Sequence, residues 1–374
     1  MKLPDKTNPA FDKFLVGGLG CGLIVLCVLL SSFYIIWQNP PRSVPTGTQA
    51  ELVPGEGSIT PGLSPTALFP FQTPDLLPTE FLTLTPGEQV ATMIPTSIAA
   101  TPVPQSQYSG TSPRGKIVFS CFVNQIDQIC IVNADGSGRR QLTELEGTSF
   151  YASLSPDGET IYFSSRHSGS YEIYSINLRG RQLKRLTRNI GSVYAPEHSP
   201  TNDRIVFTNN SGGQQRIWIM RADGNNPHPI SDGPEDIDPT WSPDGFQIAF
   251  ASARTGQRQL YIMDRDGSEV RQVTNLPDMG GRSSWSPNGN RLAFYAGPAG
   301  DHNIFVINVD GSGLVQLTNG GDNLGPSWSP DGNWIAFTSF RDGNNEIYII
   351  HPDGTGLTRL TDSPISDWQP RWGP

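Results

Sequence analysis

The residues of this 374-residue chain that could take part in chemistry are mainly carboxylates in short, polar, variable segments of its C-terminal part. The main candidates there are Asp236, Asp238, Asp322 and Asp367. Such a group could bind a cation or a basic peptide, and two carboxylates within about 10 Å could act as acid and base on a glycan. The alternative is a solvated acidic surface, because residues 114–374 hold 22 Lys and Arg against 28 Asp and Glu.

Other residues in the same variable segments are candidates for contact with a ligand or partner. They are Arg166, His167, Tyr194, Arg282 and Trp368. Tyr194 and Trp368 are the aromatic side chains that a carbohydrate-binding function would need, because an exposed ring offers a flat apolar surface with a polar end.

The sequence contains no recognisable catalytic constellation: there is no nucleophile with a paired base, no metal-ligand cluster and no phosphate-binding loop. The segment 264–267, Asp-Arg-Asp-Gly, resembles the start of a calcium loop but lacks the further oxygen ligands at set spacing. It recurs in similar form at 308–311 and 133–136, which indicates a hairpin turn. We therefore expect no cofactor, no metal site and no enzymatic activity. The net charge of −9 argues against a nucleic-acid partner.

A tandem repeat positions these residues. A Ser-Pro turn, usually followed by Asp-Gly or Asn-Gly, recurs with its serines 44, 43, 44 and 43 residues apart. These serines are Ser155, Ser199, Ser242, Ser286 and Ser329. After each turn come two short β-rich runs, a second polar turn and usually a hydrophobic-Thr pair. Four short strands per repeat of about 43 residues is typical of a β-propeller blade.

The count of repeats predicts six blades. Residues 114–374 are 261 residues, six times the repeat length, but the first unit starts at its second strand near Lys116. The chain ends in a strand-like segment whose Trp372 lies 44 residues after Trp328. We therefore expect an all-β, six-bladed propeller with four antiparallel strands per blade, closed by pairing of the C-terminal strand with the first blade. The repeated tryptophans, such as Trp328 and Trp372, are expected to pack in the core.

The repeat also predicts two different ends of the propeller. The turns after the first and third strands are nearly uniform and lie at one end. The connections after the second strand and between blades vary, and they lie at the opposite end, where the candidate residues gather.

Two of the four cysteines, Cys121 and Cys130, fall on the hairpin of the first blade and on the same face. Outside the cell they could form a disulfide, although their expected pairing is diagonal and the sequence leaves the bond open.

The N-terminal region predicts a membrane anchor. Phe14 to Trp37 is a run of 24 residues without a charge, and as a helix it would span about 36 Å, enough to cross a bilayer. The bulky residues after Ser32 argue against signal-peptide cleavage. Lys2, Lys6 and Lys13 precede the run, so we expect residues 1–13 in the cytoplasm and the rest outside, in a single-pass membrane protein.

Residues 38–113 are predicted to form a disordered linker. They contain 14 Pro and 12 Thr and show neither helical nor strand periodicity. Frequent proline prevents long helices and removes donors from a strand ladder. The sequence leaves open whether this stalk carries a recognition motif or glycans.

Residues 114–374 resemble the β-propeller of the TolB family and related WD-repeat-like propellers. The resemblance is carried by the five Ser-Pro turns, the strands of the Ile248-Ala249-Phe250 type and the Leu-Thr endings such as Leu317-Thr318. TolB itself is periplasmic, binds a lipoprotein and has an α/β domain where this chain has an anchor and a stalk. The resemblance implies an extracytoplasmic propeller that binds a partner.

The sequence therefore predicts a membrane-anchored scaffold at the bacterial cell envelope that binds a protein, peptide or other ligand without catalysis. A glycan-acting enzyme with its site in the funnel, or a carbohydrate-binding module, is the alternative.

Overall fold

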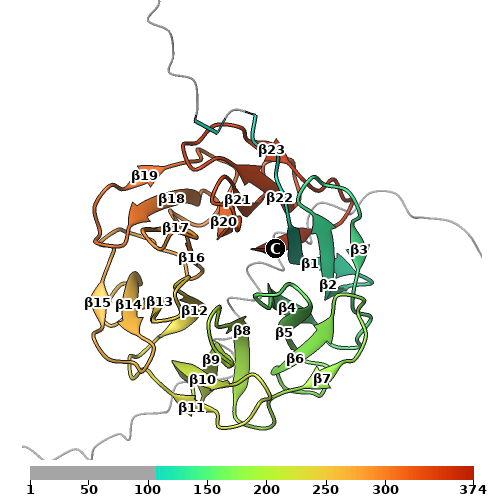
Figure 1. Cartoon of the computed structure of the whole chain (residues 1–374), viewed down its shortest axis with the longest axis vertical. Helices are drawn as coiled ribbons and strands as arrows, with labels where there is room; N and C mark the ends of the chain where they lie inside the picture. Colours follow the sequence, from blue (N-terminus) through green and yellow to red (C-terminus); the bar gives the residue numbers. More distant parts are fainter. Residues whose placement is uncertain (1–106, 109) are drawn as a thin grey trace, which may run out of the picture. The chain divides into compact units, whose positions relative to one another are not determined.

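The computed structural model describes residues 107–108 and 110–374, and these form an all-β, six-bladed propeller with four antiparallel strands in each blade (Figure 1). The prediction of fold and blade number is confirmed. No helix in the described part of the chain is long and apolar enough to cross a membrane. The predicted anchor, Phe14 to Trp37, and all but the last few residues of the predicted linker lie outside the described residues.

Each blade is a separate sheet, and its strands are given from the channel outward. Blade 1 consists of β24 (Asp367–Gly373), β1 (Lys116–Val123), β2 (Ile126–Asn133) and β3 (Arg140–Gln141). Blade 2 consists of β4 (Ser149–Leu154), β5 (Thr160–Ser165), β6 (Glu172–Asn177) and β7 (Lys184–Arg185). Blade 3 consists of β8 (Ser192–His198), β9 (Arg204–Ser211), β10 (Gln214–Arg221) and β11 (His228–Pro229).

The second half of the ring follows the same order. Blade 4 consists of β12 (Ile237–Trp241), β13 (Gln247–Ser252), β14 (Gln259–Asp264) and β15 (Arg271–Gln272). Blade 5 consists of β16 (Ser284–Trp285), β17 (Arg291–Ala296), β18 (Asn303–Asn308) and β19 (Val315–Gln316). Blade 6 consists of β20 (Asn323–Trp328), β21 (Ile335–Ser339), β22 (Glu346–Ile350) and β23 (Thr358–Arg359).

The C-terminal strand closes the ring, as predicted. β24 pairs antiparallel with β1, with Lys116 opposite Gly373 and Ile117 opposite Trp372, and the C-terminus lies beside β1 at the centre of the disc (Figure 1). The indole Nε1 of Trp372 also donates a hydrogen bond to the carbonyl of Arg114 at 2.7 Å. Both ends of the domain are thus held in one sheet.

The Ser-Pro turns owe their recurrence to a compact hydrogen-bond pattern. In blade 4 the Ser242 hydroxyl donates to the Asp244 carboxylate at 2.6 Å and accepts from the Gln247 amide at 2.9 Å. Gly245 follows with φ of +70°, a conformation that favours glycine. The serine therefore links the two ends of the turn between the first and second strands.

The hydrophobic-Thr endings have an equally specific role. In blade 4 the Thr274 hydroxyl accepts from the Leu260 amide at 2.9 Å and donates to the Gln259 side chain at 2.8 Å. Blades 1, 2, 5 and 6 repeat this pattern. In blade 3 Ser231 accepts from the Ile217 amide, but Arg216 stands where the other blades have a side-chain acceptor. The threonine thus ties the outer end of each of these blades to the start of its third strand.

The core is built from residues at repeated positions. Each blade contributes one fully buried phenylalanine, and the set is Phe119, Phe163, Phe207, Phe250, Phe294 and Phe337. The repeated tryptophans, including Trp328 and Trp372, are buried as expected. His198 takes the equivalent place in blade 3 and stacks on Tyr162 with ring centroids 5.5 Å apart.

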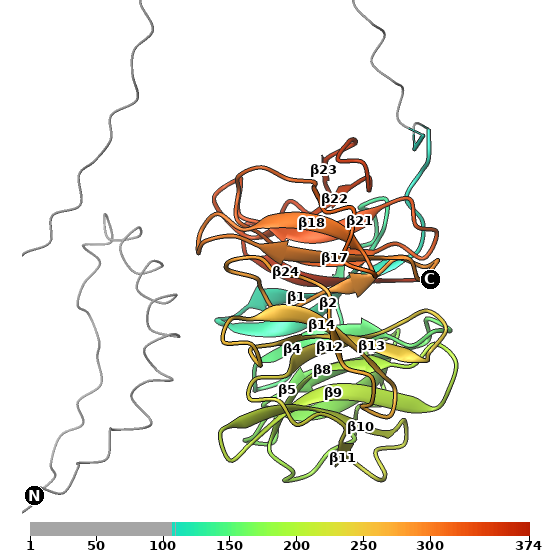
Figure 2. The ribbon, with the colours of Figure 1, turned by 90° about the vertical axis from the view of Figure 1, so that its left-hand side faces the viewer.

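The two ends of the disc differ as the repeat predicts. We call the end with the Ser-Pro turns the turn end, and the end with the connections between blades the loop face. The chain joins the propeller at the turn end, since Lys116 pairs with Gly373 there, and the segment before β1 and the C-terminus lie at the same end of the disc (Figure 2). Before that point Tyr108 is already buried, with its ring stacked on His351 at 5.2 Å.

Candidate ligand-binding site on the loop face

A repeated β-bulge shapes the inner wall of the channel at the loop face. Five of the six innermost strands shift register against their neighbours at this point. The position within the bulge recurs 44, 43, 44, 43 and 44 residues apart, at Tyr151, Ala195, Asp238, Arg282, Gly325 and Gln369. We call these six residues the bulge ring.

All members of the bulge ring except Arg282 have a positive φ, from 53° to 57°. Such a conformation is unfavourable for residues other than glycine and is concentrated at functional sites. The fold therefore imposes the same backbone at five of the six positions, while the side chain differs from blade to blade.

The bulge ring surrounds a cavity of about 150 Å³. Five of its members line this cavity together with aromatic and small polar side chains, and the full lining is Tyr151, Asp238, Arg282, Tyr295, Leu324, Gly325, Thr338, Asn345, Trp368 and Gln369. Five of the six blades contribute to it. We call it the loop-end cavity.

Asp238 and Arg282 give the loop-end cavity two opposite charges. Each residue is only 5% exposed, and neither Asp238 Oδ1 nor Arg282 Nη1 has a hydrogen-bond partner among the described residues. Burial raises the pKa of Asp238, although Arg282 and other arginines partly offset this. Burial, together with the charge of Arg371, lowers the pKa of Arg282 to about 9, although nearby Tyr151 and Asp238 act to raise it.

Closer to the turn end of the channel, an ion pair joins two blades that are not neighbours. Arg371 Nη2 of blade 1 lies 2.9 Å from the Glu197 carboxylate of blade 3, and Arg371 Nη1 donates to the Ser283 carbonyl of blade 5 at 3.0 Å. Both charged residues line a second cavity of about 250 Å³ at the turn end. Arg371 thus connects blades 1, 3 and 5 across the channel.

The other predicted carboxylates are paired. Asp236 is fully buried and lies 3.1 Å from Arg254, while Asp322 lies 2.6 Å from the ring of His302. Neighbouring basic side chains therefore pair with these carboxylates, which do not form the open group of acidic residues considered from the sequence. Of the predicted acidic residues, Asp238 is the one that lines the loop-end cavity.

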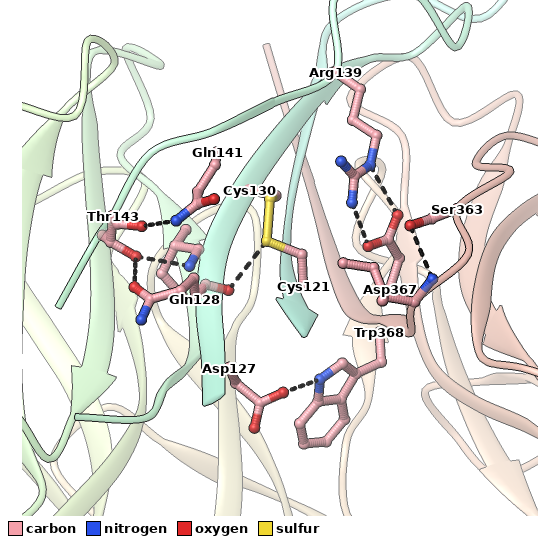
Figure 3. The surroundings of a disulfide bond; sticks show 12 residues. Cys121, Asp127, Gln128, Cys130, Arg139, Gln141, Thr143, Ser363, Asp367 and Trp368 are labelled. Carbon is pink, nitrogen blue, oxygen red and sulfur yellow. Dashed lines mark hydrogen bonds and ion pairs between the residues drawn. A yellow bond between two sulfur atoms is a disulfide. The ribbon is translucent and has the colours of Figure 1, made fainter. Parts of the chain in front are cut away.

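Asp367 and Trp368 belong to the closing strand. Asp367 is fully buried and accepts hydrogen bonds from Arg139 at 2.7 and 3.0 Å, and Trp368 Nε1 donates to Asp127 at 3.0 Å (Figure 3). Burial raises the pKa of Asp367, which Arg139 partly offsets. Asp367 thus holds blade 1 together, whereas Trp368 also lines the loop-end cavity.

The disulfide between Cys121 and Cys130 lies in the same closing blade (Figure 3). In the ladder Cys121 faces Gln128 and Cys130 faces Phe119, so the bond is diagonal, and the two Cα atoms are 5.8 Å apart. It staples the hairpin that receives β24.

The remaining predicted residues lie nearer the surface. Arg166 and His167 are exposed on the connection between β5 and β6. Tyr194 is half-buried, and its hydroxyl accepts a hydrogen bond from Gln215.

An aromatic arc beside the cavity was not predicted from the sequence. Ring centroids are 5.1 Å apart for Tyr171 and Phe150, 5.0 Å for Phe150 and Tyr151, and 5.9 Å for Tyr151 and Tyr194. We call these four residues the aromatic arc. Aligning the bulge ring across blades would have drawn attention to Tyr151, but Phe150 and Tyr171 join it only through the packing of blade 2.

No group of three or more His, Cys, Asp or Glu suited to a metal ion occurs within residues 107–108 and 110–374. The charged groups of the cavity are one carboxylate and one guanidinium.

The repeats match a known family model. The TolB beta propeller domain matches residues 100–235, 190–278 and 269–374, which together make up well over half of the chain. The chain belongs to the TolB β-propeller family. No curated protein matches the sequence.

Solved structures share the TolB β-propeller fold. TolB from Acinetobacter baumannii is 22% identical with a TM-score of 0.62, over 70% of this chain and 67% of that one. Putative TolB from Agrobacterium tumefaciens is 19% identical with a TM-score of 0.57, over 71% of this chain and 100% of that one. Kuenenia stuttgartiensis hydrazine synthase is 16% identical with a TM-score of 0.60, over 69% of this chain and 46% of that one. At these identities the likeness concerns the fold.

Proposed function

We propose that this chain is a membrane-anchored, extracytoplasmic binding protein that receives a protein partner on the loop face of its propeller. The observation that carries the proposal is the aromatic arc beside the channel mouth. Tyrosine and arginine are enriched among the residues that dominate binding energy at protein interfaces. A tyrosine offers a large apolar ring and a hydroxyl that can form a hydrogen bond.

The arginines near this mouth strengthen the proposal. Arg254 and Arg258, on the connection between β13 and β14, are ion-paired with Asp236 and Glu235. Arg166 is exposed on the corresponding connection of blade 2. These connections vary between blades on a rigid scaffold, which is where binding specificity usually lies.

Anchoring is part of the same proposal. The uncharged run from Phe14 to Trp37 is the proposed membrane span, and residues 38–113 are the proposed stalk. The chain joins the propeller at the turn end, so the loop face lies opposite the point of attachment and stays accessible. The disulfide supports an oxidising compartment such as the cell envelope.

The geometry gives less support to a glycan-cleaving enzyme. Such enzymes use two carboxylates on either side of the bond, and Asp238 is the sole carboxylate among the residues that line the loop-end cavity. Glu197 lines the other cavity and is paired with Arg371. Binding of a carbohydrate to the aromatic arc remains the second candidate, because four neighbouring rings offer stacking surfaces.

The test is capture of envelope proteins by the full-length chain in detergent, followed by affinity measurement with the captured protein. Tyr171→Ala and Arg166→Ala change the loop face, and Phe246→Ala, 58% exposed at the turn end, is the matched control. We expect the control to bind like the unchanged protein and the loop-face variants to lose more than about 1 kcal/mol. Equal binding by all variants would refute the proposal. Binding of envelope glycans instead of protein would favour the second candidate.

A further inference from the structure

Asp238 and Arg282 are an unusual pair of buried charges. They occupy equivalent places in neighbouring blades and line the same cavity, yet no ion pair within 4.0 Å joins them, although the described part of the chain has ten such pairs elsewhere. The carboxylate of Asp238 lies close to Gly281, where an added Cβ would come within 2.2 Å of Oδ2. Its other oxygen, Oδ1, has no hydrogen-bond partner among the described residues.

Arg282 is held from one side only. Its Nη2 donates to the Ala152 carbonyl across the channel at 3.4 Å, and its guanidinium carbon lies 5.3 Å from the centre of the Tyr151 ring. Nη1 has no partner among the described residues. A buried charged group without its hydrogen bonds destabilises the fold, and proteins normally pair such groups.

From this arrangement we propose that the loop-end cavity binds a small zwitterion, a free α-amino acid, with its carboxylate on Arg282 and its ammonium group on Asp238. The two unpartnered atoms are an acceptor and a donor, so one ligand that carries both charges satisfies both. A simple anion would satisfy Arg282 but be repelled by Asp238, and a simple cation would have the opposite problem.

The size and walls of the cavity fit the smaller amino acids. A cavity of about 150 Å³ admits benzene, which has the same number of non-hydrogen atoms as L-alanine, and the loop-end cavity has this volume. Leu324 and the rings of Tyr151 and Tyr295 provide apolar wall for the side chain. An internal peptide residue has neither charge, and a peptide terminus has one of the two, so the pair of charges favours the free amino acid.

This site shares Tyr151 with the aromatic arc, but the residues that test the two proposals are different. Arg166 and Tyr171, which test that interface, do not line the cavity. Failure of one proposal therefore leaves the other standing.

The experiment is equilibrium dialysis of the full-length chain in detergent with radiolabelled L-alanine. Unlabelled glycine, L-serine, L-alanine methyl ester, N-acetyl-L-alanine and acetate serve as competitors. Asp238→Asn and Arg282→Gln remove one charge each. Asp278→Asn and Arg188→Gln are the matched controls, because both side chains are exposed on loop-face connections between blades and make the same charge changes. Thermal unfolding of each variant checks that the propeller remains folded.

We expect saturable binding of alanine and displacement by glycine and serine. The ester, the N-acetyl derivative and acetate should compete at least about tenfold less well, since each lacks one charge–charge contact. Asp238→Asn and Arg282→Gln should each weaken binding by about tenfold to hundredfold, and the two controls should not.

The proposal is overturned if the unchanged protein binds no amino acid. It is also overturned if acetate competes as well as glycine, which would indicate an anion site, or if the methyl ester does, which would indicate a cation site. If Asp238→Asn fails to fold, the ranking of competitors on the unchanged protein and the Arg282→Gln variant still decide the question.

Discussion

Replacing Cys121 and Cys130 by serine should weaken the blade that closes the propeller. Cys121 lies on β1, directly opposite Asp367 of the closing strand, and Cys130 lies on β2. The disulfide therefore restrains the hairpin on which ring closure depends. Each blade of the closed ring packs against two neighbours. Loss of blade 1 would therefore leave both of its neighbours exposed and open the ring.

The magnitude follows from the length of chain that the bond encloses. The two cysteines are nine residues apart, and for a loop of this size the chain-entropy relation gives about 2.6 kcal/mol at 25 °C. At about 2–4 °C per kcal/mol for a large domain, the Tm of Cys121→Ser/Cys130→Ser should fall by about 5–10 °C.

The assay is thermal unfolding at a fixed scan rate, with and without a thiol reductant, on the full-length chain. The unchanged protein should lose stability in reductant and approach the double variant, and the variant itself should not respond. Labelling of thiols after unfolding shows whether the bond was present. If the unchanged protein, once shown to be reduced, keeps its Tm, the inference that this bond stabilises ring closure is refuted.

Three further predictions concern interactions inside the propeller. Thr274→Val should lower the free energy of unfolding by about 1–3 kcal/mol, because it leaves a buried amide without its acceptor. Ser231→Ala in blade 3 should lower the free energy of unfolding less, since that serine is partly exposed and has no side-chain acceptor like Gln259. Equal decreases for the two variants in urea unfolding would contradict this role of the Thr274 hydroxyl. Arg371→Met should destabilise by up to about 3–5 kcal/mol by leaving Glu197 unpaired in the channel, and a double variant with Glu197→Gln should recover part of this loss; strictly additive losses would exclude coupling. The folded pKa of Asp238 lies above its ordinary value of 3.8, so the folded state binds this proton more tightly than the unfolded state, and stability falls as pH rises between the two values. Asp238→Asn should therefore be more stable than the unchanged protein at pH 7, with the gap closing below pH of about 4; a gap that is constant with pH would rule out the raised pKa.

The repeat made most of the fold predictable. Ser242 and Asp244 form their turn through contacts within five residues, and Asp-Gly turns are equally local, so the sequence alone reveals them. Because these signals recur with a fixed period, the number of strands and blades followed by counting. Trp372, one repeat length after Trp328 at the end of the chain, also predicted that the C-terminal strand closes the ring.

The site was predictable only in part. Tyr194, Arg282 and Trp368 were placed correctly on the loop face by the alternation of uniform and variable connections. The partners of the carboxylates could not be inferred, since Asp367 meets Arg139 across 228 positions of sequence and Asp236 meets Arg254 across 18. Pairing at such distances depends on how blades pack, which local patterns do not encode.

The sequence by itself determined the architecture, because a propeller is built from local turns repeated at a constant interval. The tertiary structure decided what faces the channel. The register shift that creates the bulge ring is imposed by pairing between strands, so residues as different as Tyr151, Asp238 and Gln369 take the same backbone conformation. Closure of the ring then brings Asp238 and Arg282 to one cavity without pairing them. Elsewhere, the packing of neighbouring side chains pairs Asp236 with Arg254 and Asp367 with Arg139.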